Sequence, residues 1–217
     1  FTIRNVDDTD HIKKYMRSHP IRKVVVVGAG FIGLEMAENL HATGAHVSIV
    51  EMAEQVMTPI DFSMAGLVHQ HLYQKHVDLH LNQAVKGFVP VSGPDPLIRV
   101  QLNNGNVLEA DLVILSIGVR PDTSLAKQAG ITLGRTGGIH MNEYLRTSAE
   151  NVYAIGDAIE YPHPVSGEPW LNYLAGPANR QARIVADNMV FGDRIKYEGS
   201  IGTSIAKVFD LTVASTG

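Results

Sequence analysis

The stretch that decides the fold is Lys23-Val24-Val25-Val26-Val27-Gly28-Ala29-Gly30-Phe31-Ile32-Gly33-Leu34-Glu35. It opens on a β-branched run, and a continuous apolar run of this kind is typical of a buried strand in a parallel sheet. Residues 31–40 carry the pattern of a helix that follows this strand. A turn of the form Gly-x-Gly-x-x-Gly joins the two. The stretch therefore predicts the strand, turn and helix that begin an α/β fold.

Each glycine of the turn has its own physical task. Gly28 permits the tight turn, Gly30 lets the backbone approach a pyrophosphate, and Gly33 lets the helix pack closely on the strand. The N-terminus of the helix adds unpaired N–H groups and the positive end of a dipole, both of which favour phosphate. A glycine turn of this form also occurs without a ligand, so the motif needs a second feature before it predicts a dinucleotide site.

Glu51 supplies that second feature. A second apolar strand, residues 46–50, ends directly before it, roughly twenty residues beyond the glycines as a dinucleotide-binding unit requires. A carboxylate there accepts hydrogen bonds from the adenine ribose and repels a 2′-phosphate. No arginine follows in residues 52–55, so NADH is favoured over NADPH. The alternative is a solvated glutamate at a strand end.

The composition fits a protein with a sizeable core and no nucleic-acid partner. The chain has 217 residues, 45% of them hydrophobic, and a net charge of −4, which gives no reason to expect nucleic acid or an anionic membrane. We therefore expect a soluble cytoplasmic protein. It has no cysteine, so these residues offer neither a disulfide nor a thiolate. Because the chain starts at Phe1 rather than Met, we expect a piece of a longer polypeptide.

Further along the chain the hydrophobic pattern changes. Residues 61–75 indicate a helix with Phe62, Leu67, Leu72 and Met64 facing inward. Residues 84–89, 97–102 and 107–110 alternate as in a three-stranded antiparallel meander, with one turn at residues 92–96. Residues 111–116 form another apolar strand. The histidines nearby suggest no metal site, because zinc needs three or four converging ligands.

Two later glycines repeat the logic of the first turn. Gly118 follows the strand 111–116 and brings bare backbone to the edge where open α/β sheets bind ligands, unless it marks an ordinary strand exit. Gly156 and Asp157 follow a second expected strand, residues 151–155, where the aspartate faces a hydroxyl-rich ligand or caps the next segment. A largely apolar helix is expected at residues 177–189.

Four motifs occur in an order that resembles a known family. They are Gly-Ala-Gly-Phe-Ile-Gly-Leu-Glu-Met-Ala-Glu at 28–38, Ser-Ile-Gly-Val-Arg-Pro at 116–121, Thr147 with Tyr-Ala-Ile-Gly-Asp at 153–157, and Leu-Ala-Gly-Pro-Ala-Asn-Arg-Gln at 174–181. This order resembles the FAD-dependent pyridine nucleotide–disulfide oxidoreductases. Within them it is most similar to the branch of coenzyme A disulfide reductases, NADH oxidases and NADH-dependent persulfide reductases.

The resemblance implies roles for individual residues. The NAD pyrophosphate would be lined by Gly28, Gly30, Phe31, Ile32 and Gly33, with Glu51 on the adenine ribose and Gly118 beside the nicotinamide half. Glu35 is the one catalytic candidate. It matches a family glutamate that lies near the nicotinamide and the flavin ring, and this glutamate would pair with a lysine of the FAD domain. By itself it indicates only a helix acid stabilised by the dipole. The FAD contacts would be Gly156, Asp157, Leu174 and Ala175.

The resemblance also implies a domain plan and an activity. The expected fold is α/β, with a Rossmann-like NAD-binding domain at 1–117, a returning part of the FAD-binding domain at 118–195, and the start of a dimerisation domain at 196–217. The parent would be a homodimer that passes hydride from NADH to FAD and on to a disulfide, persulfide or oxygen. Since this piece would hold an incomplete FAD site, we expect it to be inactive alone.

Two other functions remain as alternatives to this interpretation. One is a flavoenzyme of the ferredoxin- or rubredoxin-reductase type. The other is a non-catalytic module that binds and senses NAD(H). The apolar stretch at residues 205–213 has no partner strands of its own in this plan, so disorder or pairing with another chain is expected there.

Overall fold

The computed structural model describes residues 1–93 and 97–217, so the expected turn at 92–96 lies partly outside the described residues. The described chain forms two compact units. Unit 1 comprises residues 1–118 and 205–215, and unit 2 comprises residues 119–204 and 216–217. Within the described ranges, no helix is both long and apolar enough to cross a membrane.

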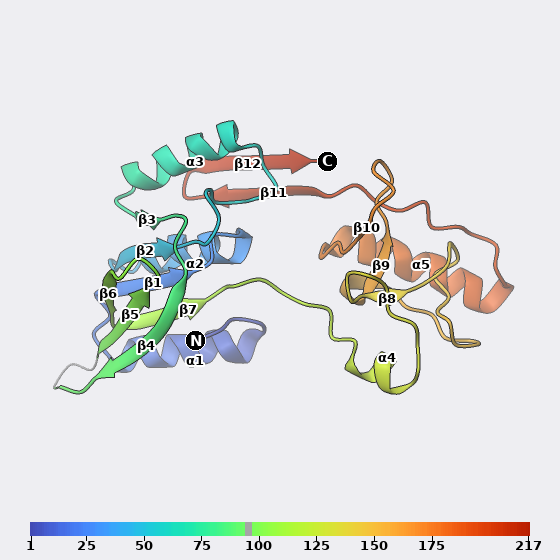
Figure 1. Ribbon diagram of the computed structural model, residues 1–217, viewed down its shortest axis with the longest axis horizontal. Helices are drawn as coiled ribbons and strands as arrows, with labels where there is room; N and C mark the ends of the chain where they lie inside the picture. The colour runs from blue at the N-terminus through green and yellow to red at the C-terminus, as the bar shows by residue number, and fades with distance from the viewer. Residues whose placement is uncertain (94–96) are drawn as a thin grey trace. The chain divides into compact units, whose positions relative to one another are not determined.

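Unit 1 is built on a four-stranded parallel sheet, which Figure 1 shows in the order β3-β2-β1-β7. The strands are β1 (Lys23–Val27), β2 (His46–Val50), β3 (Asp78–His80) and β7 (Leu112–Leu115). Four of the five β1 residues are buried, as expected for a strand covered on both faces. Val27 is in register with Val50 on one side and Leu115 on the other. The three strands therefore end level, and the residues after them share one edge of the sheet.

Two layers cover the faces of this sheet. On one face, Val26 and Ile49 pack in a core with Leu34 of helix α2 (Phe31–His41) and Leu72 of helix α3 (Phe62–Gln74). Ile12 of helix α1 (Val6–Ser18) joins the same core. The other face is covered by the expected meander, which consists of β4 (Val85–Val91), β5 (Leu97–Leu102) and β6 (Val107–Ala110). The α/β fold class is thus confirmed.

The inward face of α3 differs from the expected one. The buried residues are Ala65, Val68 and Leu72, which are spaced i, i+3 and i+7. Phe62 and Leu67 are 58% and 55% exposed, and Met64 is exposed as well. The prediction for these three side chains was wrong because the largest apolar residues were given the inward face, while the helix buries a stripe that begins with a small alanine.

Strands β11 (Thr203–Val208) and β12 (Leu211–Thr216) pair with each other. The expectation that this segment lacks partner strands was therefore wrong. The backbone N–H of Phe209, in the turn between them, donates to Oε2 of Glu38 at 2.9 Å. The next residue, Asp210, forms an ion pair with Lys75 of the same unit at 2.6 Å. Val208 is fully buried in the core of unit 1, so part of this apolar segment is covered within its own unit.

Unit 2 has little regular sheet and one long helix. Its elements are α4 (Ser124–Gln128), β8 (Ile139–His140), the 3₁₀ turn η1 (Gly156–Ala158), β9 (Ile159–Pro162), β10 (Pro169–Trp170) and α5 (Ala175–Phe191). Leu145 and Ile159 pack against Ile184 of α5 in its core. The strand expected at residues 151–155 is absent, since only Tyr153 makes a bridge, to Arg146. Val152 and Ile155 are each 38% exposed. The backbone of the segment still bonds to residues 145–147, with the N–H of Ala154 donating to the carbonyl oxygen of Leu145 at 3.1 Å.

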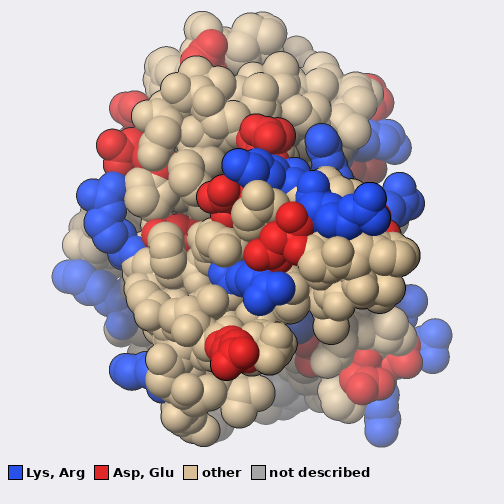
Figure 2. Space-filling model, turned by 90° about the vertical axis from the view of Figure 1, so that its right-hand side faces the viewer, with Lys and Arg blue, Asp and Glu red and all other residues tan. Residues whose placement is uncertain are grey.

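Charges are mixed on the face of the molecule that Figure 2 presents, where acidic and basic side chains are interspersed. Some acidic and basic side chains of unit 2 form ion pairs with each other. Arg146 pairs with Asp193 at 2.7 Å and Lys196 with Glu143 at 3.1 Å.

Candidate functional site

The shared edge of the unit 1 sheet carries the glycine turn. Gly28 has a φ of +102°, and a Cβ there would collide with the carbonyl oxygen of Ser116. A Cβ on Gly33 would collide with the carbonyl oxygen of Gly28. These two positions therefore need glycine, one for its backbone conformation and both for the close approach of strand ends and helix.

Gly30 is different, because nothing in the chain requires it to lack a side chain. A Cβ at this position meets no atom within 4 Å, so the space beside it is open to a ligand. Gly30 is the N-cap of α2, and no side chain caps the helix. The first N–H groups of α2 consequently remain available to an anion, where the helix dipole also favours negative charge. This geometry fits the diphosphate of a dinucleotide.

Glu51 lies at the same edge and is tied to the backbone on both sides. Its Oε2 accepts a hydrogen bond from the N–H of Ala29 at 2.7 Å, and its Oε1 accepts one from Ala53 at 2.9 Å. Glu51 is therefore held by the backbone and not freely solvated. A carboxylate offers about four acceptor positions, so two stay open for the hydroxyl groups of a ribose.

Two residues that sequence reasoning missed complete the frame of the turn. The hydroxyl of Ser116 lies 3.1 Å from the carbonyl oxygens of both Val27 and Gly28 and shares its single proton between them. The N–H of Met57 donates to the carbonyl oxygen of Ala29 at 3.0 Å. The only signal for Ser116 was its place at the start of the Ser-Ile-Gly motif, and Met57 carried no signal.

The other predicted residues of unit 1 lie at the margins of this edge. Gly118 has a φ of +91° and is exposed three residues beyond the end of β7. Glu35 is exposed on α2, further along the helix than the residues of the turn. Phe31 and Ile32 form the first residues of that helix, as the dinucleotide motif requires.

In unit 2 the predicted flavin residues gather at the start of α5. Gly156, with a φ of +76°, donates its N–H to Oε1 of the fully buried Gln181 at 2.7 Å. Asp157 is exposed beside it, and burial, followed by the charge of Asp157, raises the pKa of Tyr173. Leu174 is the N-cap of α5 and Ala175 its first residue, with no side-chain cap. These groups fit the polar part of a ligand such as FAD.

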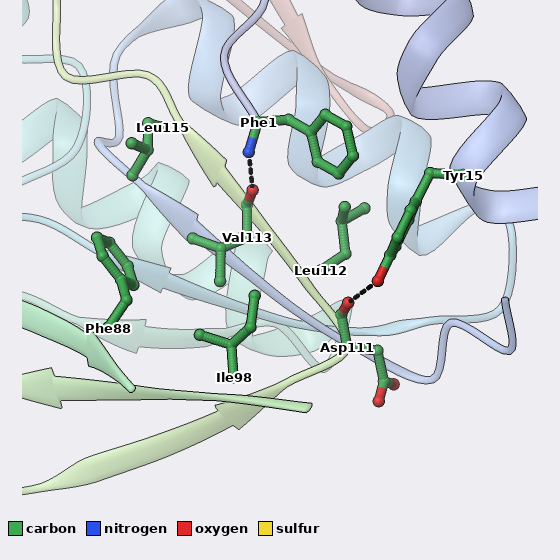
Figure 3. Close-up of a pocket in the computed structure, with 8 residues that line it drawn as sticks. All are labelled: Phe1, Tyr15, Phe88, Ile98, Asp111, Leu112, Val113 and Leu115. Carbon is green, nitrogen blue, oxygen red and sulfur yellow. Dashed lines mark hydrogen bonds between the residues drawn. The ribbon is translucent and has the colours of Figure 1, made fainter. Parts of the chain in front are cut away.

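A cavity of about 250 Å³ elsewhere in unit 1 contains none of these residues. As Figure 3 shows, it lies between the N-terminal segment, β7 and the meander, and its lining is mostly apolar. The Phe1 amino group donates to the carbonyl oxygen of Val113 at 2.8 Å at its rim. Tyr15 donates to the carbonyl oxygen of Asp111 at 3.4 Å.

Two histidines of helix α3 have neighbours that account for their positions. Nε2 of His69 accepts the N–H of Val56 at 3.1 Å, and burial lowers the pKa of His69. Nε2 of His71 lies 3.0 Å from Asp210. In the part of the chain that the structure describes, no three His, Cys, Asp or Glu side chains are grouped to hold a metal ion.

Comparison with known families agrees with this geometry. The model of the pyridine nucleotide-disulphide oxidoreductase family matches residues 1–174. The chain belongs to this family. The relatives named below carry the names of oxidoreductases, the enzyme class expected from the motifs.

Three relatives illustrate the match. The NAD(P)H sulfur oxidoreductase (CoA-dependent) of Pyrococcus abyssi is 36% identical over 218 residues, which cover the whole of this chain and 48% of that protein. The reduced CoADR-RHD structure of Bacillus anthracis is 47% identical with a TM-score of 0.93, over 100% of this chain and 38% of the other. An NAD-dependent persulfide reductase from A. fulgidus is 37% identical with a TM-score of 0.92, over 100% and 39%. The chain thus spans about half the length of the curated relative.

Proposed function

We propose that this chain is the NADH-binding portion of a flavoprotein oxidoreductase that passes hydride from NADH to FAD and on to a disulfide, persulfide or oxygen. The observation that carries this proposal is the uncapped start of α2 beside Gly30, open to solvent at the edge that also holds Glu51. Free N–H groups suit a diphosphate, and a carboxylate at the end of the neighbouring strand suits a ribose diol. Membership of the family and the name of the A. fulgidus relative support this assignment.

The nucleotide preference follows from charge. The Glu51 carboxylate is fixed by Ala29 and Ala53, so it cannot swing away from a 2′-phosphate without losing both bonds. Repulsion between the carboxylate and that phosphate disfavours NADPH. Glu54, the next acidic residue, is exposed and adds negative charge.

In unit 2 we assign Gly156, Asp157, Leu174 and Ala175 to one end of FAD. Asp157 would accept hydrogen bonds from the ribityl hydroxyls, and the uncapped start of α5 would face the flavin. When bound, FAD supplies the chemistry that accepts a hydride, and the protein supplies orientation and electrostatics. Glu35 is assigned to the nicotinamide end of the site, Gly118 to the nicotinamide half of NADH.

The domain plan belongs to the same proposal. Residues 1–117 would form the NAD-binding domain, residues 118–195 a part of the FAD-binding domain, and residues 196–217 the start of a dimerisation domain. The parent protein would be a homodimer. Electrons would leave the flavin for a thiol-type centre or for oxygen, and these cysteine-free residues supply no thiol.

Calorimetric titration of the purified 217-residue chain with NADH and with NADPH tests the proposal. We expect NADH to bind with a 1:1 stoichiometry and more tightly than NADPH. Absence of NADH binding would refute the assigned site. Equal or reversed affinities would refute the role of Glu51 while leaving the site in place.

A further inference from the structure

The peptide group between Gly28 and Ala29 is held at both ends. Its carbonyl oxygen accepts a hydrogen bond from the Ser116 hydroxyl at 3.1 Å, and its N–H donates to Glu51 at 2.7 Å. Because a peptide group is planar, two bonds on opposite sides fix its rotation about the chain. The first plane of the turn is therefore set by Ser116 and Glu51 together.

The next peptide group, between Ala29 and Gly30, is fixed by the first and by Met57. Its carbonyl oxygen accepts the N–H of Met57 at 3.0 Å. In a trans peptide the N–H points opposite to the carbonyl oxygen, so the Gly30 N–H is directed away from Met57. It precedes the free N–H groups that begin α2.

Ser116 is packed closely against the glycine turn. Its carbonyl oxygen and hydroxyl lie so close to Gly28 and Gly33 that a Cβ on either glycine would not fit. Val27 already receives the backbone N–H of Ser116 at 2.8 Å in addition to the hydroxyl. The hydroxyl proton is shared between the two carbonyl oxygens, and the bond to Gly28 is the one that acts on the peptide group between Gly28 and Ala29.

We propose that Ser116 is a positioning residue for diphosphate recognition, which acts by setting the first peptide plane of the glycine turn. This inference rests on the proposed NADH site. Ser116 touches no ligand in this scheme. Its hydroxyl orients the Gly28 carbonyl, the opposite N–H is thereby directed to Glu51, and the N–H groups that follow are directed towards the diphosphate.

Replacement of Ser116 by alanine removes the hydroxyl without adding bulk. The Gly28 carbonyl then loses this donor, and the turn gains rotational freedom. A neutral hydrogen bond contributes about 0.5–1.5 kcal/mol, which corresponds to a loss of about two- to twelvefold in NADH affinity. The ³¹P resonances of bound NADH should also move, because they report the surroundings of the diphosphate.

Ser18 provides a matched control in the same unit. Its hydroxyl also donates to two carbonyl oxygens, those of Lys14 and Tyr15, at 3.1 and 3.0 Å. It lies at the end of α1 and has no contact with the glycine turn. Ser18→Ala therefore removes a similarly shared hydrogen bond, together with a 3.0 Å contact to Nδ1 of His19, and should leave both NADH affinity and the ³¹P resonances unchanged.

The experiment is calorimetry and ³¹P NMR of NADH bound to wild type, Ser116→Ala and Ser18→Ala, with urea unfolding of each. The expected result is weaker binding and shifted resonances for Ser116→Ala alone. A purely structural serine would lower the unfolding midpoint of Ser116→Ala with wild-type affinity and resonances, and this would overturn the inference but not the proposed function. A wild-type chain that binds no NADH would overturn both.

Discussion

Oε2 of Glu51 lies 2.7 Å from the backbone nitrogen of Ala29 and joins the end of β2 to the turn after β1. A carboxylate that was expected only to meet a ribose thus also holds the turn proposed to meet the diphosphate. A substitution that removes the carboxylate of Glu51 will change two things at once, the charge proposed to select the nucleotide and the support of the turn.

Glu51→Arg should reverse the nucleotide preference. The variant loses the acceptor of the ribose hydroxyls and repels no 2′-phosphate, so NADH affinity should fall by about tenfold or more, given about 1.5–3 kcal/mol for a hydrogen bond to a charged group. NADPH should become the tighter ligand, and titration calorimetry measures both. Glu54→Arg makes the same charge change on an exposed neighbour and should keep the preference for NADH. Two variants with the same preference would contradict a specific role for Glu51.

Gly28→Ala should be among the most destabilising substitutions in unit 1. Gly105→Ala is the control, because Gly105 also has a positive φ, +89°, but open space around it. We expect Gly105→Ala to cost about 1–3 kcal/mol through backbone strain. Gly28→Ala should cost about 1–3 kcal/mol more, because its methyl group overpacks against Ser116. Urea unfolding followed by circular dichroism gives both values, and equal losses would contradict the collision.

Glu160 should make unit 2 sensitive to acid. Burial raises the pKa of its carboxyl, but hydrogen bonds from Thr136 and Arg135 outweigh burial, and the pKa lies below its usual value of 4.5. A carboxylate with a lowered pKa in the folded state stabilises the fold above its unfolded pKa, and this contribution is lost as the pH falls through the folded pKa. Wild type should therefore lose stability below about pH 4.5.

Glu160→Gln should remove that part of the pH dependence and be less stable than wild type at pH 7. The chain's single tryptophan, Trp170, lies in unit 2 and reports its unfolding by fluorescence. Glu150→Gln is the control, since Glu150 is an exposed residue of the same unit and its replacement should leave the profile of wild type intact. If the stability of wild type and of Glu160→Gln changed with pH in parallel, Glu160 would not be the source of the acid sensitivity.

The chain alone should bind NADH and show no NADH-dependent disulfide reduction. Its residues include no cysteine to accept electrons, and hydride transfer requires the reacting atoms within about 3–3.5 Å in a fixed orientation. An absorbance assay with NADH and a disulfide, with and without added FAD, measures this directly. A yellow preparation with stoichiometric FAD and disulfide turnover would contradict both this prediction and the domain plan.

The strand ends of unit 1 could be predicted, because continuous apolar runs indicate buried parallel strands and the glycines come directly after these runs. The contacts of Ser116 and Met57 could not, because each joins segments that only the folded sheet brings together. The hairpin of β11 and β12 was not predicted, for a local reason. Its turn, Phe209 and Asp210, lacks the Asn-Gly type of signal, although Phe209 adopts a φ of +55°.

In unit 2 the motif around Gly156 was found correctly in sequence but placed on a strand that is absent. Val152 and Ile155 have the residue types of a strand, yet only Tyr153 is bridged. Residue preference indicated an extended backbone, but the pairing with residues 145–147 is limited to one bridge and a few hydrogen bonds, which is too short to form a strand. Gln181, which holds the Gly156 turn, was part of a quoted motif but had no assigned role.

Titration of NADH into Gly30→Leu and Gly66→Leu tests most directly whether the glycine turn is the diphosphate site. Both glycines have open space around a Cβ and neither has a positive φ, but Gly30 caps α2 and Gly66 lies on α3. A leucine at position 30 would occupy the path of the diphosphate. We predict that Gly30→Leu loses NADH binding while Gly66→Leu binds as wild type does. Wild-type affinity in Gly30→Leu would contradict the account.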